Sequence, residues 1–253
     1  MISKILLKQI RALHQKKNRE LAGKYIIEGF KLFEEAIFSQ PSNIERIIHI
    51  PELKNNIHFK GLQQKIPVDQ VSTNDFMKIS ILENPQGIMA VMKKPVEKSD
   101  GNDNLVLMID SVRDPGNLGT IIRIADWFGI GKIFCSSDTV DCYNPKVVQA
   151  TMGSIFRVSL EYGHLNEFID SLAGLGYTIY GTSLKGENIF NAKLAMPSVI
   201  ILGSESHGVS ENMLGMTQKN LYIPNFSKSE KKTESLNVSV SAAIICSEFR
   251  RRQ

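Results

Sequence analysis

From Leu105 onward, short apolar runs alternate with stretches whose apolar residues have helical spacing. The runs expected as strands cover 105–109, 132–135, 177–181, 198–202 and 221–223. Helical spacing is found near 118–128, 145–152, 165–174, 209–216 and 236–250. Because parallel strands need crossover connections, which are usually helices, this alternation predicts a mostly parallel sheet. The sequence therefore indicates an α/β domain over residues 104–253.

The first 95 residues predict a smaller α/β unit. Strands are expected at 25–29, 44–50, 67–71 and 87–92, and helices at 2–14 and 30–38. A polar, turn-rich stretch follows, with Pro95, Gly101 and Asn102. We therefore expect a domain over 1–95, a linker over 96–103 and a second domain over 104–253.

The positive charge is concentrated in the first domain. Residues 1–95 hold 15 Lys+Arg against 9 Asp+Glu, a surplus of +6, and the remaining residues hold 15 against 17, a deficit of −2, which together give the net +4. The first twenty residues alone contain Lys4, Lys8, Arg11, Lys16, Lys17 and Arg19. Such clustering predicts a polyanionic partner, although a solvated lysine-rich helix face is the open alternative.

Several classes of protein lack support in the sequence. Lysines interrupt the apolar residues near the N-terminus, so no signal peptide is expected, and nothing else is long enough to span a membrane. The three cysteines, Cys135, Cys142 and Cys246, have no metal-ligand spacing and cannot all pair, so we expect free thiols in a reducing cytoplasm. Neither a metal-ligand cluster nor the glycine fingerprint of dinucleotide-binding folds is present.

The first strand of the second domain leads into a glycine-bearing turn and a helix. Asn117 is a plausible N-cap of this helix. Arg123 falls among apolar neighbours one turn after Gly119. The segment alone leaves open whether Arg123 is functional or only a surface arginine.

Two later segments also carry candidate functional side chains. Gly203 follows a buried strand and permits close approach to its backbone, and Glu205 can accept a proton or hydrogen bond or merely begin a helix. His207 is a candidate base or a bystander. Nearer the C-terminus, Ser235 can cap a helix, and the Asn237 amide must find partners if it is buried.

Taken in order, three motifs resemble those of the SpoU (TrmH) family of RNA ribose 2′-O-methyltransferases, in the SPOUT superfamily. They are the segments 117–123, 202–205 and 223–224 with 235–239. Residues 9–95 resemble the N-terminal substrate-binding domain of many members, which is similar to an RNA-binding ribosomal-protein fold. The resemblance implies a C-terminal trefoil knot, a homodimer, S-adenosylmethionine as cofactor, and RNA as substrate, ribosomal RNA more readily than tRNA.

The resemblance also implies roles for individual residues. The positions that match the family's catalytic site are Asn117, Arg123, Glu205, Ser235 and Asn237. The positions that match its cofactor site are Thr182, Leu202, Gly203, Ile223 and Leu236. Members of the family use the arginine across the dimer, so Arg123 is expected to act in cis or in trans. Because a guanidinium stays protonated, our own hypothesis is that Arg123 binds the neighbouring phosphate, while Glu205 or solvent takes the proton. Ser206 and His207, together with a long loop before Ser235, leave a non-catalytic RNA-binding relative as the alternative.

Overall fold

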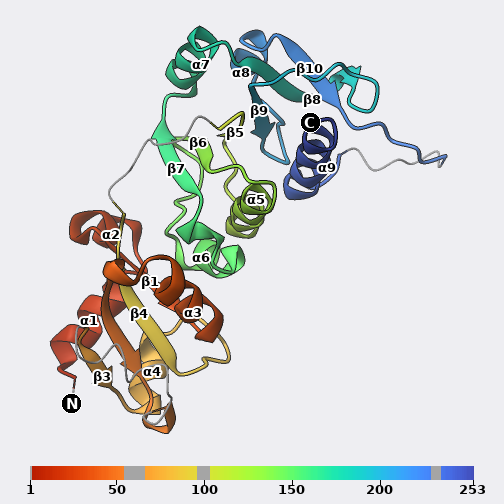
Figure 1. Cartoon of the computed structure of the whole chain (residues 1–253). Coiled ribbons are helices and arrows are strands. Elements are labelled where there is room, and N and C mark those ends of the chain that lie inside the picture. Colours follow the sequence, from red (N-terminus) through yellow and green to blue (C-terminus); the bar gives the residue numbers. More distant parts are fainter. Residues whose placement is uncertain (1, 54–65, 96–102, 229–234) are drawn as a thin grey trace. The chain divides into compact units, whose positions relative to one another are not determined.

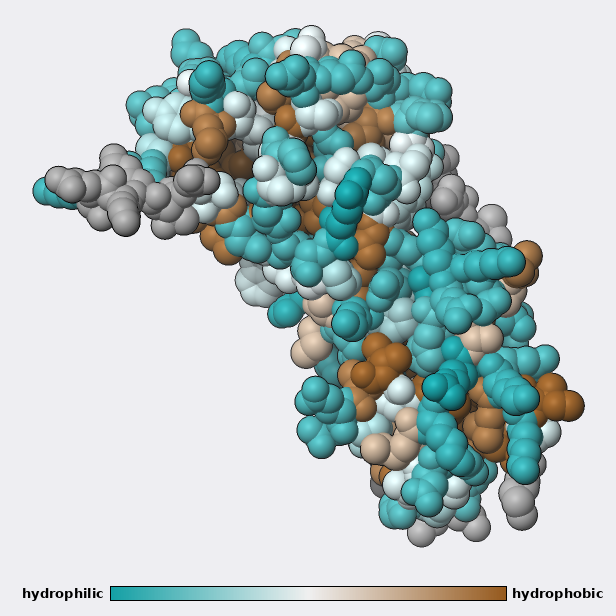
Figure 2. Space-filling model, turned by 180° about the vertical axis from the view of Figure 1, so that it is seen from behind, coloured by the Kyte–Doolittle hydropathy of each residue, from teal (hydrophilic) through white to brown (hydrophobic). Residues whose placement is uncertain are grey.

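The computed structural model describes residues 2–53, 66–95, 103–228 and 235–253, which form two compact units (Figure 1). The first unit contains 1–98 and 141–156, and the second contains 99–140 and 157–253. The predicted linker over 96–103 lies almost wholly outside the described residues. Polar side chains cover most of the surface, and exposed apolar side chains form patches among them (Figure 2). None of the described helices has the length and apolarity needed to cross a membrane.

The first unit is built on a four-stranded mixed sheet. Its strands are β1 (Lys24–Glu28), β2 (Ile44–His49), β3 (Val68–Gln70) and β4 (Ile88–Lys93). In the order β1-β4-β2-β3, β4 is antiparallel to both its neighbours, and β2 is parallel to β3. All four strands fall where the sequence predicts them.

Helices cover this sheet. They are α1 (Lys4–Ala12), α2 (Lys16–Ala22), α3 (Phe30–Ser39), α4 (Thr73–Ile79) and α6 (Pro145–Thr151). Ile10 of α1 and Phe76 of α4 share a core with Ile26, Ile48 and Met89 of the sheet. Since side chains alternate along a strand, the intervening residues face the other side, where α3 packs on β1 and β4. The sequence did not predict α2 and α4.

Arg19 is buried and joins the N-terminal helices to the segment 141–156. Its Nε and Nη2 donate to Asp141 Oδ2 at 3.0 and 2.6 Å, and its Nη1 donates to the carbonyls of Leu13 and His14 at 3.0 and 2.8 Å. The side chain is only 2% exposed. Arg19 is therefore part of the core, and its inclusion among the charges facing a polyanion is wrong. The boundary expected from sequence keeps 141–156 in the second domain, whereas these residues pack within the first unit.

The second unit contains a six-stranded sheet. Its strands are β5 (Leu105–Asp110), β6 (Lys132–Ser136), β7 (Ser159–Gly163), β8 (Thr178–Asn188), β9 (Ser198–Gly203) and β10 (Lys219–Tyr222). Their order is β10-β8-β9-β5-β6-β7, and every pairing is parallel. This confirms the predicted α/β class with a mostly parallel sheet. β7 was not predicted.

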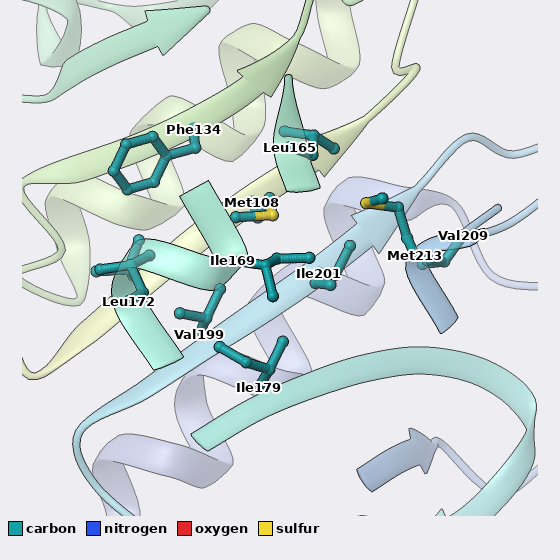
Figure 3. Packing of buried hydrophobic residues seen from close by; sticks show 11 residues of the cluster. Met108, Phe134, Leu165, Ile169, Leu172, Ile179, Val199, Ile201, Val209 and Met213 are labelled. Atoms are coloured by element: carbon teal, nitrogen blue, oxygen red, sulfur yellow. The ribbon is translucent and has the colours of Figure 1, made fainter. Parts of the chain in front are cut away.

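Two layers of helices enclose this sheet. They are α5 (Pro115–Trp127), α7 (Leu165–Gly174), α8 (Glu211–Gly215) and α9 (Val238–Arg251). Residues of α7 and α8, such as Ile169 and Met213, share one apolar cluster with Met108, Val199 and Ile201 of the central strands (Figure 3). α5 and α9 pack against each other, and α9 contacts β9. Covering both faces explains why every residue of β5 and β9 is buried.

Candidate active site

The candidate residues gather where the central parallel strands end. Asp110, the last residue of β5, pairs in register with Gly203, the last residue of β9. On the other side of β9, Gly181 pairs with Ile201, so Thr182 lies level with the end of β9. Carboxyl ends of parallel strands are the usual ligand-binding edge of such sheets.

A chain of side-chain amides crosses this edge. Asn237 Nδ2 donates to Asn117 Oδ1 at 2.9 Å, and Asn117 Nδ2 donates to Glu205 Oε1. These three residues come from the start of α9, the first turn of α5 and the loop after β9. The structure thus brings together three of the five predicted catalytic residues, which are far apart in sequence.

Hydrogen bonds at both ends fix the direction of this chain. Asn237 Oδ1 accepts from Ser239 N at 3.0 Å, Ser239 Oγ at 2.5 Å and Val240 N at 3.4 Å. Its Nδ2 is therefore the group left to face Asn117. At the other end Asn117 turns its NH₂ toward Glu205 Oε1, which accepts. The amides orient one oxygen of Glu205 and leave Oε2 available.

The helix caps differ from those predicted. Asp114 caps α5, since its Oδ1 accepts from Asn117 N at 2.8 Å, and Asn237 caps α9. The predictions that Asn117 and Ser235 are N-caps are wrong. Asn117 instead lies in the first turn of α5, where its amide is free to reach Glu205 and Asn237. Ser235 precedes α9, is exposed, and has no hydrogen bond to any other described residue.

Gly203 is required because the chain folds back on it. A Cβ at this position would lie 2.0 Å from the Gly208 carbonyl carbon and 2.1 Å from Val209 N. The loop between them is closed by Ser204 N donating to Gly208 O at 3.1 Å and by Gly208 N donating to Ser204 O at 2.8 Å. Gly203 was predicted to admit a close neighbour, and the neighbour seen is the loop that carries Glu205.

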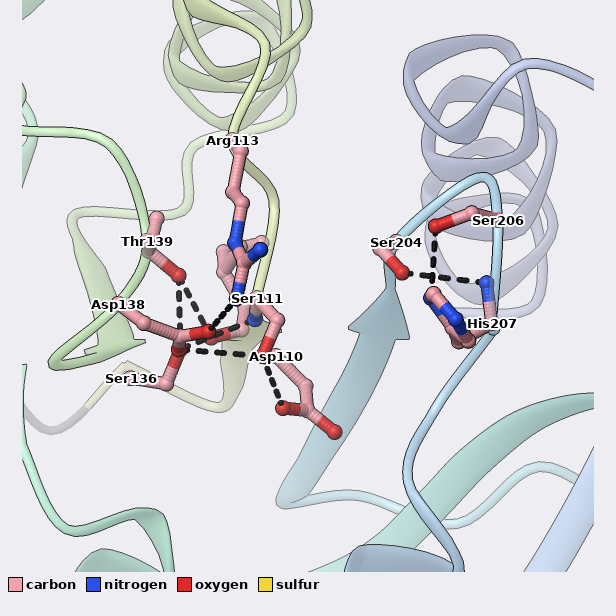
Figure 4. Close-up of polar contacts among 10 residues, drawn as sticks. Asp110, Ser111, Arg113, Ser136, Asp138, Thr139, Ser204, Ser206 and His207 are labelled. Atoms are coloured by element: carbon pink, nitrogen blue, oxygen red, sulfur yellow. Dashed lines mark hydrogen bonds and ion pairs between the residues drawn. The ribbon is translucent and has the colours of Figure 1, made fainter.

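Asp110 connects this loop to a polar network at the end of β6. Its Oδ2 accepts from Ser210 N at 2.9 Å. Its Oδ1 accepts from Ser111 Oγ at 3.1 Å (Figure 4). Ser111 Oγ and Ser136 Oγ also lie 3.1 and 2.8 Å from Asp138 Oδ1. Asp110 is only 7% exposed. The sequence places Asp110 at the carboxyl end of its strand, on the expected ligand-binding edge, but did not assign it a role there.

The remaining candidates are placed as follows. Arg123 is exposed on α5 and makes no hydrogen bond or ion pair with other described residues. Leu202 is 1% exposed, so only its backbone can reach a ligand, whereas Leu236 is 46% exposed. Ile223 is half-buried, immediately after β10. Thr182 Oγ1 donates to Ile201 O at 2.9 Å.

Comparison with known proteins identifies the chain. Residues 104–247 match the model of the SpoU rRNA methylase family, more than half of the chain. The chain belongs to the SpoU rRNA methylase family. This confirms the resemblance seen in the three motifs and makes the protein an RNA methyltransferase. Residues 5–90 of this SpoU protein match the MRM3-like substrate binding domain.

Individual relatives cover nearly the whole SpoU protein. RlmP of Bacillus subtilis, a 23S rRNA (guanosine(2553)-2′-O)-methyltransferase, is 35% identical and aligns over 94% of this chain and 93% of its own. A TrmH-family structure from Porphyromonas gingivalis has a TM-score of 0.86 at 32% identity, covering 100% of both chains. An AdoMet-bound rRNA methyltransferase from Sinorhizobium meliloti also has a TM-score of 0.86, at 26% identity, covering 100% of this chain and 96% of the other.

Proposed function

We propose that this SpoU protein transfers the methyl group of S-adenosylmethionine to a ribose 2′-hydroxyl of structured RNA, and that its substrate is ribosomal RNA in preference to tRNA. The observation that carries the proposal is the amide chain Asn237–Asn117–Glu205, which holds a carboxylate at the strand-end edge. The names of RlmP and of the Sinorhizobium meliloti protein support the reaction and the cofactor.

The residues present fit S-adenosylmethionine. Gly203 and Leu202 offer backbone groups at the end of β9, and exposed Leu236 and half-buried Ile223 offer apolar surface for an adenine. Glu205 supplies the negative charge that a cationic ligand requires. When bound, the cofactor supplies a methyl group that is already activated on a sulfonium. We assign Thr182, Leu202, Gly203, Ile223 and Leu236 to its binding.

The chain's own task is to orient the ribose and remove a proton. Asn117 holds Glu205 Oε1, which leaves Oε2 as the acceptor for the 2′-hydroxyl proton, directly or through water. Asn237 positions Asn117 in turn. Ser235, exposed just before α9, is assigned to a hydrogen bond with the RNA. The rate gain comes from alignment as much as from proton transfer.

Arg123 is assigned to phosphate binding. A guanidinium stays protonated in proteins, so it is unsuited to act as a base, but its fork matches a phosphate. Its exposure and its lack of a partner among the described residues leave it available. We expect Arg123→Lys to lose most turnover, because lysine binds phosphate as a point charge. Near-full turnover by this variant would contradict bidentate phosphate binding.

We also propose a homodimer, a C-terminal trefoil knot and a cytoplasmic location. Trp127 on α5 is 85% exposed and Val240 on α9 is 48% exposed, and these two helices pack together. Such apolar side chains favour a covered face, across which Arg123 would serve the partner subunit. The three cysteines are buried free thiols, as a reducing compartment allows.

The direct test is methyl transfer to RNA. Purified protein, radiolabelled S-adenosylmethionine and unmodified 23S rRNA or bulk tRNA transcripts are incubated, and 2′-O-methylated positions are mapped. We expect ribosomal RNA to be labelled and Glu205→Gln to abolish labelling. Calorimetry with S-adenosylmethionine tests the alternative, because absence of binding at millimolar cofactor would favour a non-catalytic RNA-binding protein.

A further inference from the structure

Arg113 stands beside the candidate site and is held in place by a single carboxylate. Its Nη2 donates to Asp138 Oδ2 at 2.8 Å, and the side chain is 76% exposed. No other hydrogen bond of this guanidinium is seen within the described part of the chain. The fork therefore has donors to spare, and they face solvent.

The carboxylate that holds Arg113 is itself fixed by several groups. Asp138 Oδ1 lies within hydrogen-bond distance of Ser111 Oγ and Ser136 Oγ, at 3.1 and 2.8 Å (Figure 4). The Arg113 guanidinium, followed by the hydroxyls of Ser136 and Ser111, holds the pKa of Asp138 below its ordinary value. Asp138 is thus an anion with a fixed position, and it restricts where Arg113 can point.

The backbone beneath this network is unusual. Ser111 has φ 62°, in the left-handed region that non-glycine residues rarely occupy. In this conformation its N donates to Ser136 Oγ at 2.9 Å while its hydroxyl reaches Asp138. Such a conformation costs about 1 kcal/mol or more and persists only where surrounding contacts determine it. The loop between β5 and α5 is therefore rigidly attached to the end of β6.

Register places this network and Glu205 on opposite sides of one strand. At the end of β5, Ile109 pairs with Cys135 of β6, and Asp110 pairs with Gly203 of β9. With neighbouring strands about 4.8 Å apart, the ends of β6 and β9 are separated by roughly 10 Å. An RNA strand lying over Glu205 and crossing these strand ends would pass the Arg113 side chain.

We infer that Arg113, anchored by Asp138, binds a phosphate of the RNA strand flanking the methylated nucleotide. This inference rests on the proposed function and adds to it a second phosphate contact, distinct from that of Arg123. Asp138 keeps the guanidinium above the strand ends, while the exposed donors of the fork face the phosphate. Arg113 is thus a substrate-binding residue and has no part in proton transfer.

Arg157 offers a matched control. Its Nη2 donates to Asp126 Oδ2 at 2.8 Å, and its side chain is 40% exposed, but its partner lies near the C-terminal end of α5. Arg113→Ala and Arg157→Ala each remove one ion-paired surface arginine. Binding of an unmodified 23S rRNA transcript is measured by filter retention from 50 to 200 mM salt, with S-adenosylmethionine affinity measured by calorimetry.

We expect Arg113→Ala to weaken RNA binding roughly 3- to 10-fold and to lower the salt slope by about 0.7–0.9, the value of one phosphate contact. Arg113→Lys should retain the slope, because it retains the charge. Arg157→Ala and the cofactor affinity of all variants should match wild type.

Two results would overturn the inference while leaving the proposed function intact. The first is that Arg113→Ala binds the RNA transcript with the affinity and salt slope of wild type, while the wild-type protein methylates RNA. The second is an equal loss for Arg157→Ala, which would make the effect one of general charge. A wild-type protein that neither binds nor methylates the transcript would overturn both.

Discussion

Asn237 performs two tasks that substitution can separate. Its Oδ1 caps α9, and its Nδ2 begins the hydrogen-bond chain that ends on Glu205. Asn237→Asp keeps an oxygen for the cap but replaces the donor with an acceptor. Asn117 must then turn its NH₂ toward the carboxylate introduced at position 237. Its carbonyl oxygen then faces Glu205, which also accepts, so the hydrogen bond to Glu205 is lost. We expect this variant to fold normally and to lose activity.

The magnitudes follow from the bonds concerned. A hydrogen bond to a charged group contributes about 1.5–3 kcal/mol. Because Glu205 is exposed, we take the lower end, which corresponds to roughly a tenfold loss of kcat. The cap is worth about 1 kcal/mol. Asn237→Asp and Asn237→Ser both retain a capping oxygen, so their free energies of unfolding should stay within about 0.5 kcal/mol of wild type, whereas Asn237→Ala should lose about 1 kcal/mol.

The assay pairs urea unfolding with single-turnover methyl transfer for the three variants. All three should lose turnover, and only Asn237→Ala should also lose stability. Turnover that follows stability across the series would mean that Asn237 serves the helix alone. Wild-type turnover by Asn237→Asp would refute the hydrogen-bond chain as the support of Glu205.

The remaining predictions concern packing, acid stability and RNA binding. Gly203→Ala should destabilise the fold by about 3 kcal/mol or more in urea unfolding, because its Cβ would meet backbone, whereas Gly215→Ala enters open space and should be tolerated. Arg251 and Arg252 lower the Glu248 pKa from 4.5 to about 2. The ionised carboxylate therefore adds to the free energy of unfolding, fully above pH 4.5 and less as the pH falls toward 2. In Glu248→Gln, the free energy of unfolding measured in urea should vary less with pH over that range than in wild type. Reversing the exposed charges Lys8 and Arg11 to Glu should weaken binding to the 23S transcript and reduce its salt slope. An unchanged slope would contradict RNA capture by α1.

The architecture could be predicted from sequence because buried parallel strands are continuous apolar runs. β5 and β9 are the clearest cases, with every residue buried. β7 escaped prediction because it is an edge strand whose Ser159–Gly163 segment is mostly half-buried and carries polar residues. Helix starts were misplaced because Asn117 and Ser235 are themselves good capping residues. Composition alone cannot choose between two candidate caps a few positions apart.

Contacts between distant residues set the limit of prediction at the site. The resemblance supplied Asn117, Glu205 and Asn237 as site positions. Asn117 is 88 residues from Glu205 and 120 residues from Asn237 in sequence, so no local pattern shows that they are hydrogen-bonded or in which direction. Arg19 illustrates the same limit. Its charge suggested an exposed cation, whereas its partner Asp141, 122 residues away, makes it a core residue.

The way Glu205 is held distinguishes it from carboxylates that only build structure. Asp126, Asp138 and Glu248 are each paired with an arginine, which orients the carboxylate but also neutralises it. Within the described residues Glu205 has no such cation and is bound by the neutral amide of Asn117. An amide orients an oxygen without cancelling its charge, and the N-termini of α5 and α9 favour a negative charge there. A fixed carboxylate that keeps its charge is what a sulfonium ligand and a hydroxyl about to lose a proton both require.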